Sequence, residues 1–317
     1  MNWINGFELL CYGITAILLT DVLIHRRWAE LRLFCSAALA GFILELLAVR
    51  VTGIYHYSPD FFIDLGFEPY QFPFFGGLMW GGLTVCGLRI SSKLHLGKLL
   101  TALFTGWLIV SMDMLLDVAA IRLNSGFWVW EGRPITLNVN YHMFMSVIWV
   151  NFLGYLFETP AVVYFFLKAE EKADKRSIGK LILQILLIGL GGVAVVGAAS
   201  GLSLFLNDMT DEWFACVAYL FLWILILAGM IVQSARKKLS FGFSIKHNWT
   251  TILFWVAIYG YCLAALWQLG IIQTIPVYGV FAVCMTVFTL LLACLYINKE
   301  PLPARVMAPS FFLKFYK

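Results

Sequence analysis

Residues 99–122 read LLTALFTGWLIVSMDMLLDVAAIR, an apolar run long enough to cross a membrane as a helix. Two aspartates, Asp113 and Asp117, interrupt this run. An ionised carboxylate is costly in a bilayer, so acids inside a span are candidates for a functional site. A spacing of four residues places both side chains on one helix face, about 6 Å apart. Because two like charges this close in a low dielectric are unfavourable, the sequence predicts a protonated acid beside a carboxylate.

The rest of the chain has the composition of a polytopic membrane protein. Of its 317 residues, 62% are hydrophobic and 13% are charged, which excludes an ordinary soluble domain and a disordered chain. The apolar runs predict an all-α membrane helix bundle with nine transmembrane helices. Their predicted bounds are residues 6–24, 33–50, 73–90, 99–122, 141–168, 181–206, 213–234, 249–272 and 275–297.

Basic residues fall mostly on one side of this predicted bundle. Of the 22 lysines and arginines, all except Arg50, Arg122 and Arg133 lie on the same side. The positive-inside rule therefore places the N-terminus outside and the C-terminus in the cytoplasm. An even number of spans would destroy this sorting. We expect a multi-pass integral membrane protein, in the bacterial cytoplasmic membrane.

The basic segment 169–180 divides the chain into two regions. Residues 1–168 hold five predicted spans, and residues 181–317 hold four spans and a cytoplasmic tail. The seven cysteines lie in apolar runs without a CxxC pair, and the five histidines fall in or beside loops. The sequence therefore predicts no disulfide framework, no metal site and no cofactor. It carries no nucleotide-binding motif, and we expect no nucleic-acid partner.

Other polar and aromatic residues are expected to share the outer half of the bilayer with the two aspartates. At about 1.5 Å per residue, Glu45 lies roughly 7 Å, Trp80 roughly 10 Å and Asn151 roughly 15 Å below the outer boundary. The outer loops add four aromatic residues: Tyr55, Tyr57, Trp128 and Trp130. Most of these positions also have an ordinary explanation. Asp117 could pair with Arg122 or Arg50, and Glu45 with Arg50. Asn151 could form an interhelical hydrogen bond, Trp80 could be a packing residue, and the four loop aromatics could form an interfacial belt.

Three further acids in the predicted spans are weaker candidates. Glu8 lies at the outer end of the first span, and Asp21 lies near its inner end within reach of His25. Glu158 lies in the inner half of the fifth span, two residues before Pro160. A deep acid in a kinked helix can mark an ion path.

The first 160 residues resemble the membrane carotenoid hydratases, the carotenoid 1,2-hydratase type also called carotenoid biosynthesis proteins. That family is expected to have an acid in a helix, then Thr-Gly, then Tyr-x-Tyr, a Trp in the next helix, D-x-x-x-D followed by G-x-W-x-W, and an N-F-x-G-W element. The matching residues are Glu45, Thr52-Gly53, Tyr55-His56-Tyr57, Trp80, Asp113, Asp117, Gly126-Phe127-Trp128-Val129-Trp130 and Asn151-Phe152-Leu153-Gly154-Tyr155.

The chain departs from this pattern at a few positions. Val118 stands where a proline usually follows the second aspartate, and Tyr155 stands where the last element usually ends in Trp. Residues 148–150 read Ile-Trp-Val where Val-Pro is usual. The G-x-W-x-W loop is also similar to that of the small membrane lycopene cyclases.

The resemblance implies an enzyme of carotenoid or isoprenoid lipid biosynthesis, a hydro-lyase that adds water to the terminal alkene of a polyene. A carboxylic acid kept neutral by an apolar site can protonate the alkene, and a carboxylate can orient water toward the cation. We expect Asp113 to be the proton donor, Asp117 to orient water, and Glu45 to be a second acid. The pocket would be lined by Trp80, Tyr55, Tyr57, Trp128, Trp130 and Asn151.

Three alternatives remain open from the sequence. A membrane carotenoid or terpene cyclase would use the same protonation step, with an internal alkene capturing the cation. A proton-coupled transporter would explain Asp21 and Glu158, but no paired broken helices occur in matching halves. A non-catalytic scaffold would leave the acids inside the spans without an explanation.

Overall fold

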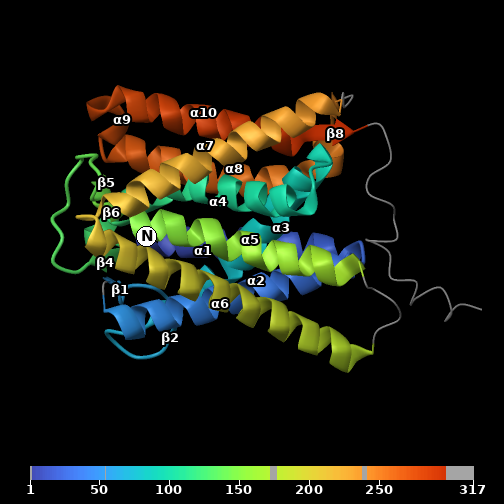
Figure 1. Ribbon diagram of the computed structural model, residues 1–317, viewed down its shortest axis with the longest axis horizontal. Helices are drawn as coiled ribbons and strands as arrows, with labels where there is room; N and C mark the ends of the chain where they lie inside the picture. The colour runs from blue at the N-terminus through green and yellow to red at the C-terminus, as the bar shows by residue number, and fades with distance from the viewer. Residues whose placement is uncertain (1, 54, 172–176, 238–240, 298–317) are drawn as a thin grey trace, which may run out of the picture.

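The computed structural model describes residues 2–53, 55–171, 177–237 and 241–297. The long helices lie side by side along one direction, and the short strands gather at the two ends of the bundle (Figure 1). Among the described residues, eight helices are long and apolar enough to cross a membrane. They are α1 (Trp3–Ile24), α2 (Trp28–Leu47), α4 (Lys98–Ala120), α5 (Trp149–Glu171), α6 (Ile178–Met209), α7 (Trp213–Arg236), α8 (Ile245–Gln268) and α10 (Pro276–Cys294).

A ninth long helix, α3 (Phe74–Ser91), corresponds to the remaining predicted span. It carries five glycines and Arg89, falls outside the set of eight, and is mostly buried beside α1, α2 and α4. The prediction of an all-α bundle of membrane-spanning helices is therefore confirmed at this level. That all nine helices cross the membrane stays a prediction.

The start of the fifth span was predicted wrongly. Residues 141–148 do not begin a helix, because two short strands form a hairpin there and α5 begins only at Trp149. These strands are β5 (Met143–Phe144) and β6 (Val147–Ile148). Met145 and Ser146 make the turn in the left-handed region, at φ 47° and 71°, which a helix cannot continue through.

The loops that the sequence predicts to lie outside, called the outer loops below, form further short strand pairs at the end of the bundle where the chain begins, at the left in Figure 1. Here β1 (Tyr55–Tyr57) pairs with β4 (Trp128–Trp130), and β2 (Asp64–Leu65) pairs with β3 (Phe72–Pro73). At the opposite end β7 (Phe241–Phe243) pairs with β8 (Leu295–Ile297). The short helical turns are η1 (Ala48–Thr52), η2 (Ser92–Leu94), η3 (Leu123–Ser125) and α9 (Ile271–Thr274).

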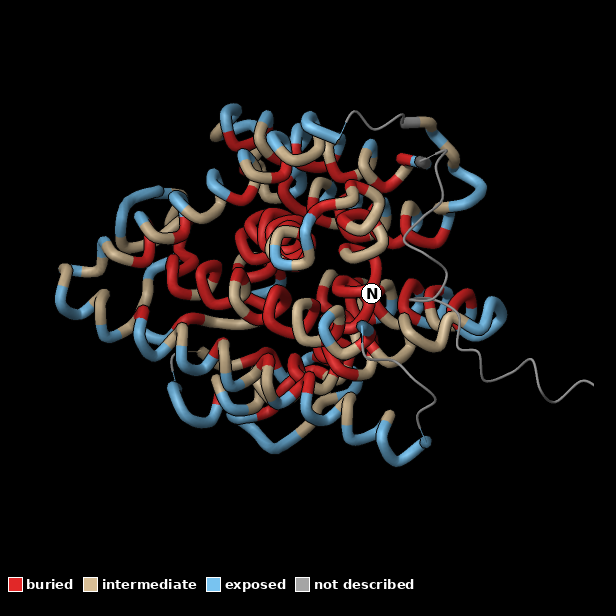
Figure 2. The backbone as a smooth tube through the Cα atoms, turned by 45° about the vertical axis from the view of Figure 1, so that its right-hand side comes forward, coloured by how far each residue is buried: buried red, intermediate tan, exposed pale blue. Residues whose placement is uncertain are grey.

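The two predicted regions share one hydrophobic core, which occupies the middle of the bundle (Figure 2). The indole N–H of Trp107 on α4 donates to the carbonyl of Trp223 on α7, at 2.9 Å. The Tyr278 hydroxyl on α10 donates to the Met114 carbonyl on α4, at 2.8 Å. Large apolar side chains also cover the outside of α6, α7 and α10, including Leu187, Phe221 and Val277. An apolar outer surface of this kind suits a lipid environment.

Basic side chains join the helix ends at the end of the bundle opposite the outer loops. Lys93 donates to the Ala293 carbonyl at 2.9 Å, and Lys98 pairs with Glu171. Residues 172–176 of the predicted basic segment and the predicted cytoplasmic tail, residues 298–317, lie outside the described residues.

Candidate functional site

A cavity near the outer-loop end of the bundle contains all nine residues predicted for the site. It is enclosed by α2, α3, α4, α5 and the β1–β4 pair, and it measures about 730 Å³ with its mouth included. We call it the carboxyl cavity. The predicted residues that line it are Glu45, Tyr55, Tyr57, Trp80, Asp113, Asp117, Trp128, Trp130 and Asn151. Their convergence is a property of the fold, and their chemical roles stay predictions.

The β1–β4 pair brings the two aromatic motifs together. Tyr55 lies opposite Trp130 and Tyr57 opposite Trp128, in antiparallel register. Side chains alternate between the two faces of a strand, so these four rings point to the same face, which is the cavity side. His56 points to the other face, where its Nδ1 contacts the Glu131 carboxylate at 2.5 Å. The spacing of Tyr-x-Tyr and Trp-x-Trp is therefore the period of a strand.

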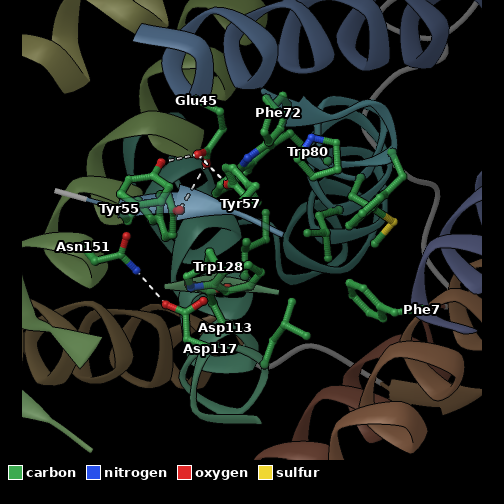
Figure 3. A pocket seen from close by; sticks show the side chains of 18 of the residues that line it. Phe7, Glu45, Tyr55, Tyr57, Phe72, Trp80, Asp113, Asp117, Trp128 and Asn151 are labelled. Atoms are coloured by element: carbon green, nitrogen blue, oxygen red, sulfur yellow. Dashed lines mark hydrogen bonds between the residues drawn. The ribbon is translucent and has the colours of Figure 1, made fainter. Parts of the chain in front are cut away.

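Glu45 accepts hydrogen bonds from three tyrosines (Figure 3). Tyr55 and Tyr57 donate to its Oε2 at 2.6 and 2.9 Å. Tyr155 donates to its Oε1 at 3.1 Å. Burial, and then the nearby Glu45 carboxylate, raise the pKa of Tyr55 and Tyr57 well above 10, which keeps both hydroxyls as donors. Helix α2 changes to the π-helical turn η1 three residues after Glu45, a feature common near functional sites.

The two aspartates on α4 have different partners. Asp117 Oδ2 accepts a hydrogen bond of 2.7 Å from the Asn151 amide of α5, as Figure 3 shows. Asp113 Oδ2 is buried and has no hydrogen-bond partner among the described residues. Asp113 is close enough to Glu45, and Asp117 close enough to both, for their charges to interact. A buried polar atom without a partner is rare in proteins and requires an explanation.

No described basic side chain forms an ion pair with Glu45, Asp113 or Asp117, although their exposed fractions are only 3%, 8% and 2%. Pairing of Asp117 with Arg122 was one expected alternative. Arg122 instead donates to backbone carbonyls, including those of Val118 at 2.6 Å and Met145 at 2.9 Å. This arginine thus fixes the outer loop and leaves the carboxyl groups without a cation.

The remaining wall of the cavity is apolar and aromatic. Trp80 on α3 packs edge-on against Tyr155, with ring centroids 4.8 Å apart. Gly41 on α2 makes room for this indole, because a Cβ there would lie 2.3 Å from the Trp80 ring. Trp130 Nε1 is buried without a hydrogen-bond partner among the described residues. The cavity therefore has an unpaired acceptor, Asp113 Oδ2, and an unpaired donor in its wall.

Several residues of this site were not predicted from the sequence. Tyr155 was assigned only to a family motif, although its spacing of four from Asn151 places both on one face of α5. Single hydrophobic residues also line the cavity, and no local sequence pattern distinguishes them from core residues. Among them are Phe7, Phe72, Phe75, Met79, Leu83, Ile109, Met112 and Leu116.

Glu8 fastens the loop that follows β1. Its carboxylate is fully buried and accepts the backbone N–H groups of Phe62 at 2.6 Å and Ile63 at 3.1 Å. Asp64 lies next in this loop. Burial, and then the charges of Glu8 and Glu68, raise its pKa from 3.8 to about 6. The loop continues to Phe72 in the cavity wall, so Glu8 has a structural role beside the site.

The other two candidate acids lie outside the cavity wall. Asp21 is paired with Arg27 at 2.9 Å and with Arg89 at 3.2 Å, near the opposite end of the bundle. Glu158 is buried on α5, and its Oε2 has no hydrogen-bond partner in the described part of the chain. It is close enough to Glu45 and Asp113 for their charges to interact.

Among the described residues, no group of three or more His, Cys, Asp and Glu side chains is arranged to hold a metal ion. The site thus combines three buried acids, two unpaired polar atoms and an aromatic wall.

Comparison of the chain with protein-family models, curated proteins and solved structures found no match.

Proposed function

We propose that this protein is a membrane enzyme that hydrates the terminal alkene of a polyene or isoprenoid lipid by acid catalysis. The observation that carries the proposal is Asp113, a buried carboxyl group with an unpaired oxygen in an apolar, aromatic cavity. A carboxylic acid kept neutral by such surroundings can donate a proton to a weakly basic substrate. The aromatic lining suits a hydrocarbon chain, with a few polar groups to orient it.

The proposed reaction has two steps, and its atoms balance. In the first step the Asp113 carboxyl transfers its proton to the CH carbon of the terminal (CH₃)₂C=CH group, and the π electrons form the new C–H bond. This leaves a tertiary cation. In the second step water attacks the cation through oxygen, and Asp117 takes the proton that the water loses. Asn151 holds the Asp117 carboxylate for this task through its 2.7 Å hydrogen bond.

Glu45 and the aromatic rings are proposed to stabilise the cation. Three hydroxyl donors suit an ionised Glu45, because hydrogen bonds to a carboxylate favour its charged form. A fixed negative charge beside a developing positive charge lowers the barrier. The faces of Trp80 and Trp128 add cation–π attraction. In this proposal Glu45 supplies the counter-charge and Asp113 is the acid.

Expression in cells that accumulate lycopene tests the proposal. Wild-type protein should convert the pigment to a product heavier by one water molecule, measured by mass spectrometry. Asp113→Asn and Asp117→Asn should each lower conversion by about 10²–10⁴-fold, the usual contribution of a general acid or base. Asp60→Asn, at an exposed loop position, is the matched control and should convert normally. A product of unchanged mass would establish cyclisation instead, and full activity of both variants would refute acid catalysis at this pair.

We also propose that the carboxyl cavity opens toward the extracytoplasmic side. Most basic residues lie at the end of the predicted spans that is opposite the carboxyl cavity. Basic residues in the loops of membrane proteins are retained on the cytoplasmic side. A single cysteine at Ser125, in a chain whose own cysteines are replaced, should react with an impermeant maleimide added to intact cells. A cysteine at Ser177 should react only after lysis. The reverse pattern would overturn this orientation.

A further inference from the structure

A second cavity lies between α2, α5 and α6, and we call it the side cavity. It measures about 590 Å³ with its mouth included. Helix α6 lies along α2 and α5 in Figure 1 and packs against both. One face of α6 contributes Val196, Ser200 and Leu204, at the four-residue spacing of a helix face. Leu44 and Ala48 contribute the facing wall from α2 and η1.

The side cavity and the carboxyl cavity share a wall. Five residues line both cavities: Glu45, Tyr55, Trp130, Asn151 and Tyr155. The two spaces are therefore separated by a single layer of side chains. The hydrogen bonds from Tyr55 and Tyr155 to Glu45 lie in this layer.

The position of the side cavity suits entry from the lipid bilayer. Leu47 on α2 and Leu202 and Phe205 on α6 lie on the same turns as its wall and are exposed to the surroundings of the bundle. Gly154 of α5 allows α6 to pack closely, because a Cβ there would lie 3.0 Å from Ser200 Oγ. The walls from α2 and α6 are mostly apolar, which suits a hydrocarbon chain and not a hydrated ion.

We propose that the side cavity binds the hydrocarbon chain of an isoprenoid substrate whose reacting end occupies the carboxyl cavity. The substrate then enters sideways from the membrane, between α2 and α6. This inference rests on the proposed function for the identity of the chain. It assigns to Ser200 and Val196 a role in binding the chain, and to Tyr155 a place at the passage between the cavities.

Photo-cross-linking tests this binding site without any need for turnover. The purified protein in phosphatidylcholine nanodiscs is exposed to a farnesyl chain that carries an alkyl diazirine, and the labelled peptides are mapped by mass spectrometry. Label is expected on the peptides that contain 44–52 and 196–204. Ser200→Trp fills the cavity and should lower this labelling about tenfold, the order expected when a pocket excludes a hydrophobic group. Ala198→Trp, on the exposed side of the same helix, should label as the wild type does.

Two results would overturn the inference. One is equal labelling of the wild type and Ser200→Trp. The other is stronger labelling of the same peptides by a palmitoyl diazirine that excess farnesol does not compete away, because the cavity would then hold a membrane acyl chain. Melting temperatures within a few degrees of the wild type show that both tryptophan variants are folded.

Kinetics separate this inference from the proposed function. Ser200→Trp should lower conversion of lycopene about tenfold and leave conversion of a geranyl-length alkene unchanged, because the short substrate needs only the carboxyl cavity. Blocked labelling in a protein that hydrates no polyene would support the chain site and refute the proposed function. Normal hydration of lycopene by Ser200→Trp would refute the chain site and retain the function.

Discussion

The two ends of this helix bundle bury acidic side chains in opposite ways. At the end with the basic residues, Arg89 contacts Glu30 at 2.6 Å and Asp21 at 3.2 Å, and Arg27 contacts Asp21 at 2.9 Å. Thr250 of α8 donates to the same Asp21 at 3.0 Å. Every acid in this cluster, which we call the ion cluster, has a cation. In the carboxyl cavity three acids are buried, as Asp21 is, and none of them has a cation.

The difference separates a structural use of buried acids from a chemical one. A buried charge is tolerated when a partner and hydrogen bonds offset its loss of hydration. The ion cluster meets this condition and joins α1, α2, α3 and α8. The carboxyl cavity does not meet it, so its acids are a cost to the fold. A fold that keeps such a cost is expected to use it at a functional site.

The largest effect on stability is expected from the ion cluster. Arg89→Met removes the nearest cation of Glu30 and one of the two arginines that contact Asp21. Removing one partner of a buried ion pair costs about 3–5 kcal/mol. Thermal unfolding of the purified protein in detergent should show a clear fall in Tm. Arg50→Met, at an exposed arginine, is the matched control and should change little. Asp113→Asn should leave Tm unchanged or raise it, because it removes an unpaired buried acid. A lower Tm for Asp113→Asn than for Arg89→Met would contradict the distinction between a structural ion cluster and a chemical carboxyl cavity.

A smaller effect is expected from the tyrosines that bind Glu45. Tyr155→Phe keeps the ring that packs on Trp80 and removes one donor to the carboxylate. A hydrogen bond to a charged group contributes about 1.5–3 kcal/mol, so conversion of polyene should fall roughly 10–100-fold. Tyr259→Phe, a buried hydroxyl that bonds Thr289 on α10, should leave conversion unchanged. Equal activity of Tyr155→Phe and wild type would remove Glu45 from the mechanism.

The smallest effect concerns the loop that Glu8 fastens. The pKa of Asp64 rises from 3.8 to about 6 in the folded protein, chiefly through burial and then through Glu8 and Glu68. A raised pKa means that the folded loop prefers the protonated acid. The contribution of Asp64 to the stability of the folded loop is complete below pH 3.8 and is lost as the pH rises through about 6.

Hydrogen exchange of residues 58–73, corrected for the intrinsic rate at each pH, measures this effect. Protection should decrease between pH 4 and pH 7 in the wild type, as ionised Asp64 is repelled by its acidic neighbours. Asp64→Asn should show a flat profile over the same range. A profile in Asp64→Asn that matches the wild type would assign the pH dependence to another group.

Most of the helices were predictable from the sequence, because long apolar runs have few alternatives in a membrane protein. The exception at 141–148 has a cause outside its own segment. Arg122, at the end of α4, binds the Met145 carbonyl and so fixes the hairpin turn before α5. That contact joins residues far apart in the chain, and no periodicity within the segment could reveal it.

The candidate site was predictable only in part, because some of its contacts join different elements of the fold. Asp113 and Asp117 share a helix face by spacing alone, and their presence in a span marks them. The partner of Asp117 was not decided by the sequence, since an arginine in a nearby loop and an amide on another helix were both within reach. Only the packing of α4 against α5 places Asn151 at 2.7 Å from it. The pairing of the two aromatic motifs in β1 and β4 also needs the fold.

The proton transfer from Asp113 to carbon is the central claim, and turnover in heavy water tests it most directly. Purified wild-type protein is incubated with lycopene in D₂O, and the product is returned to H₂O before mass analysis. Deuterium on oxygen exchanges away and deuterium on carbon remains. The proposed mechanism predicts a hydrated product with one retained deuterium, and no such product from Asp113→Asn. Formation of the same deuterated product by Asp113→Asn at the wild-type rate would contradict the assignment of this carboxyl as the acid.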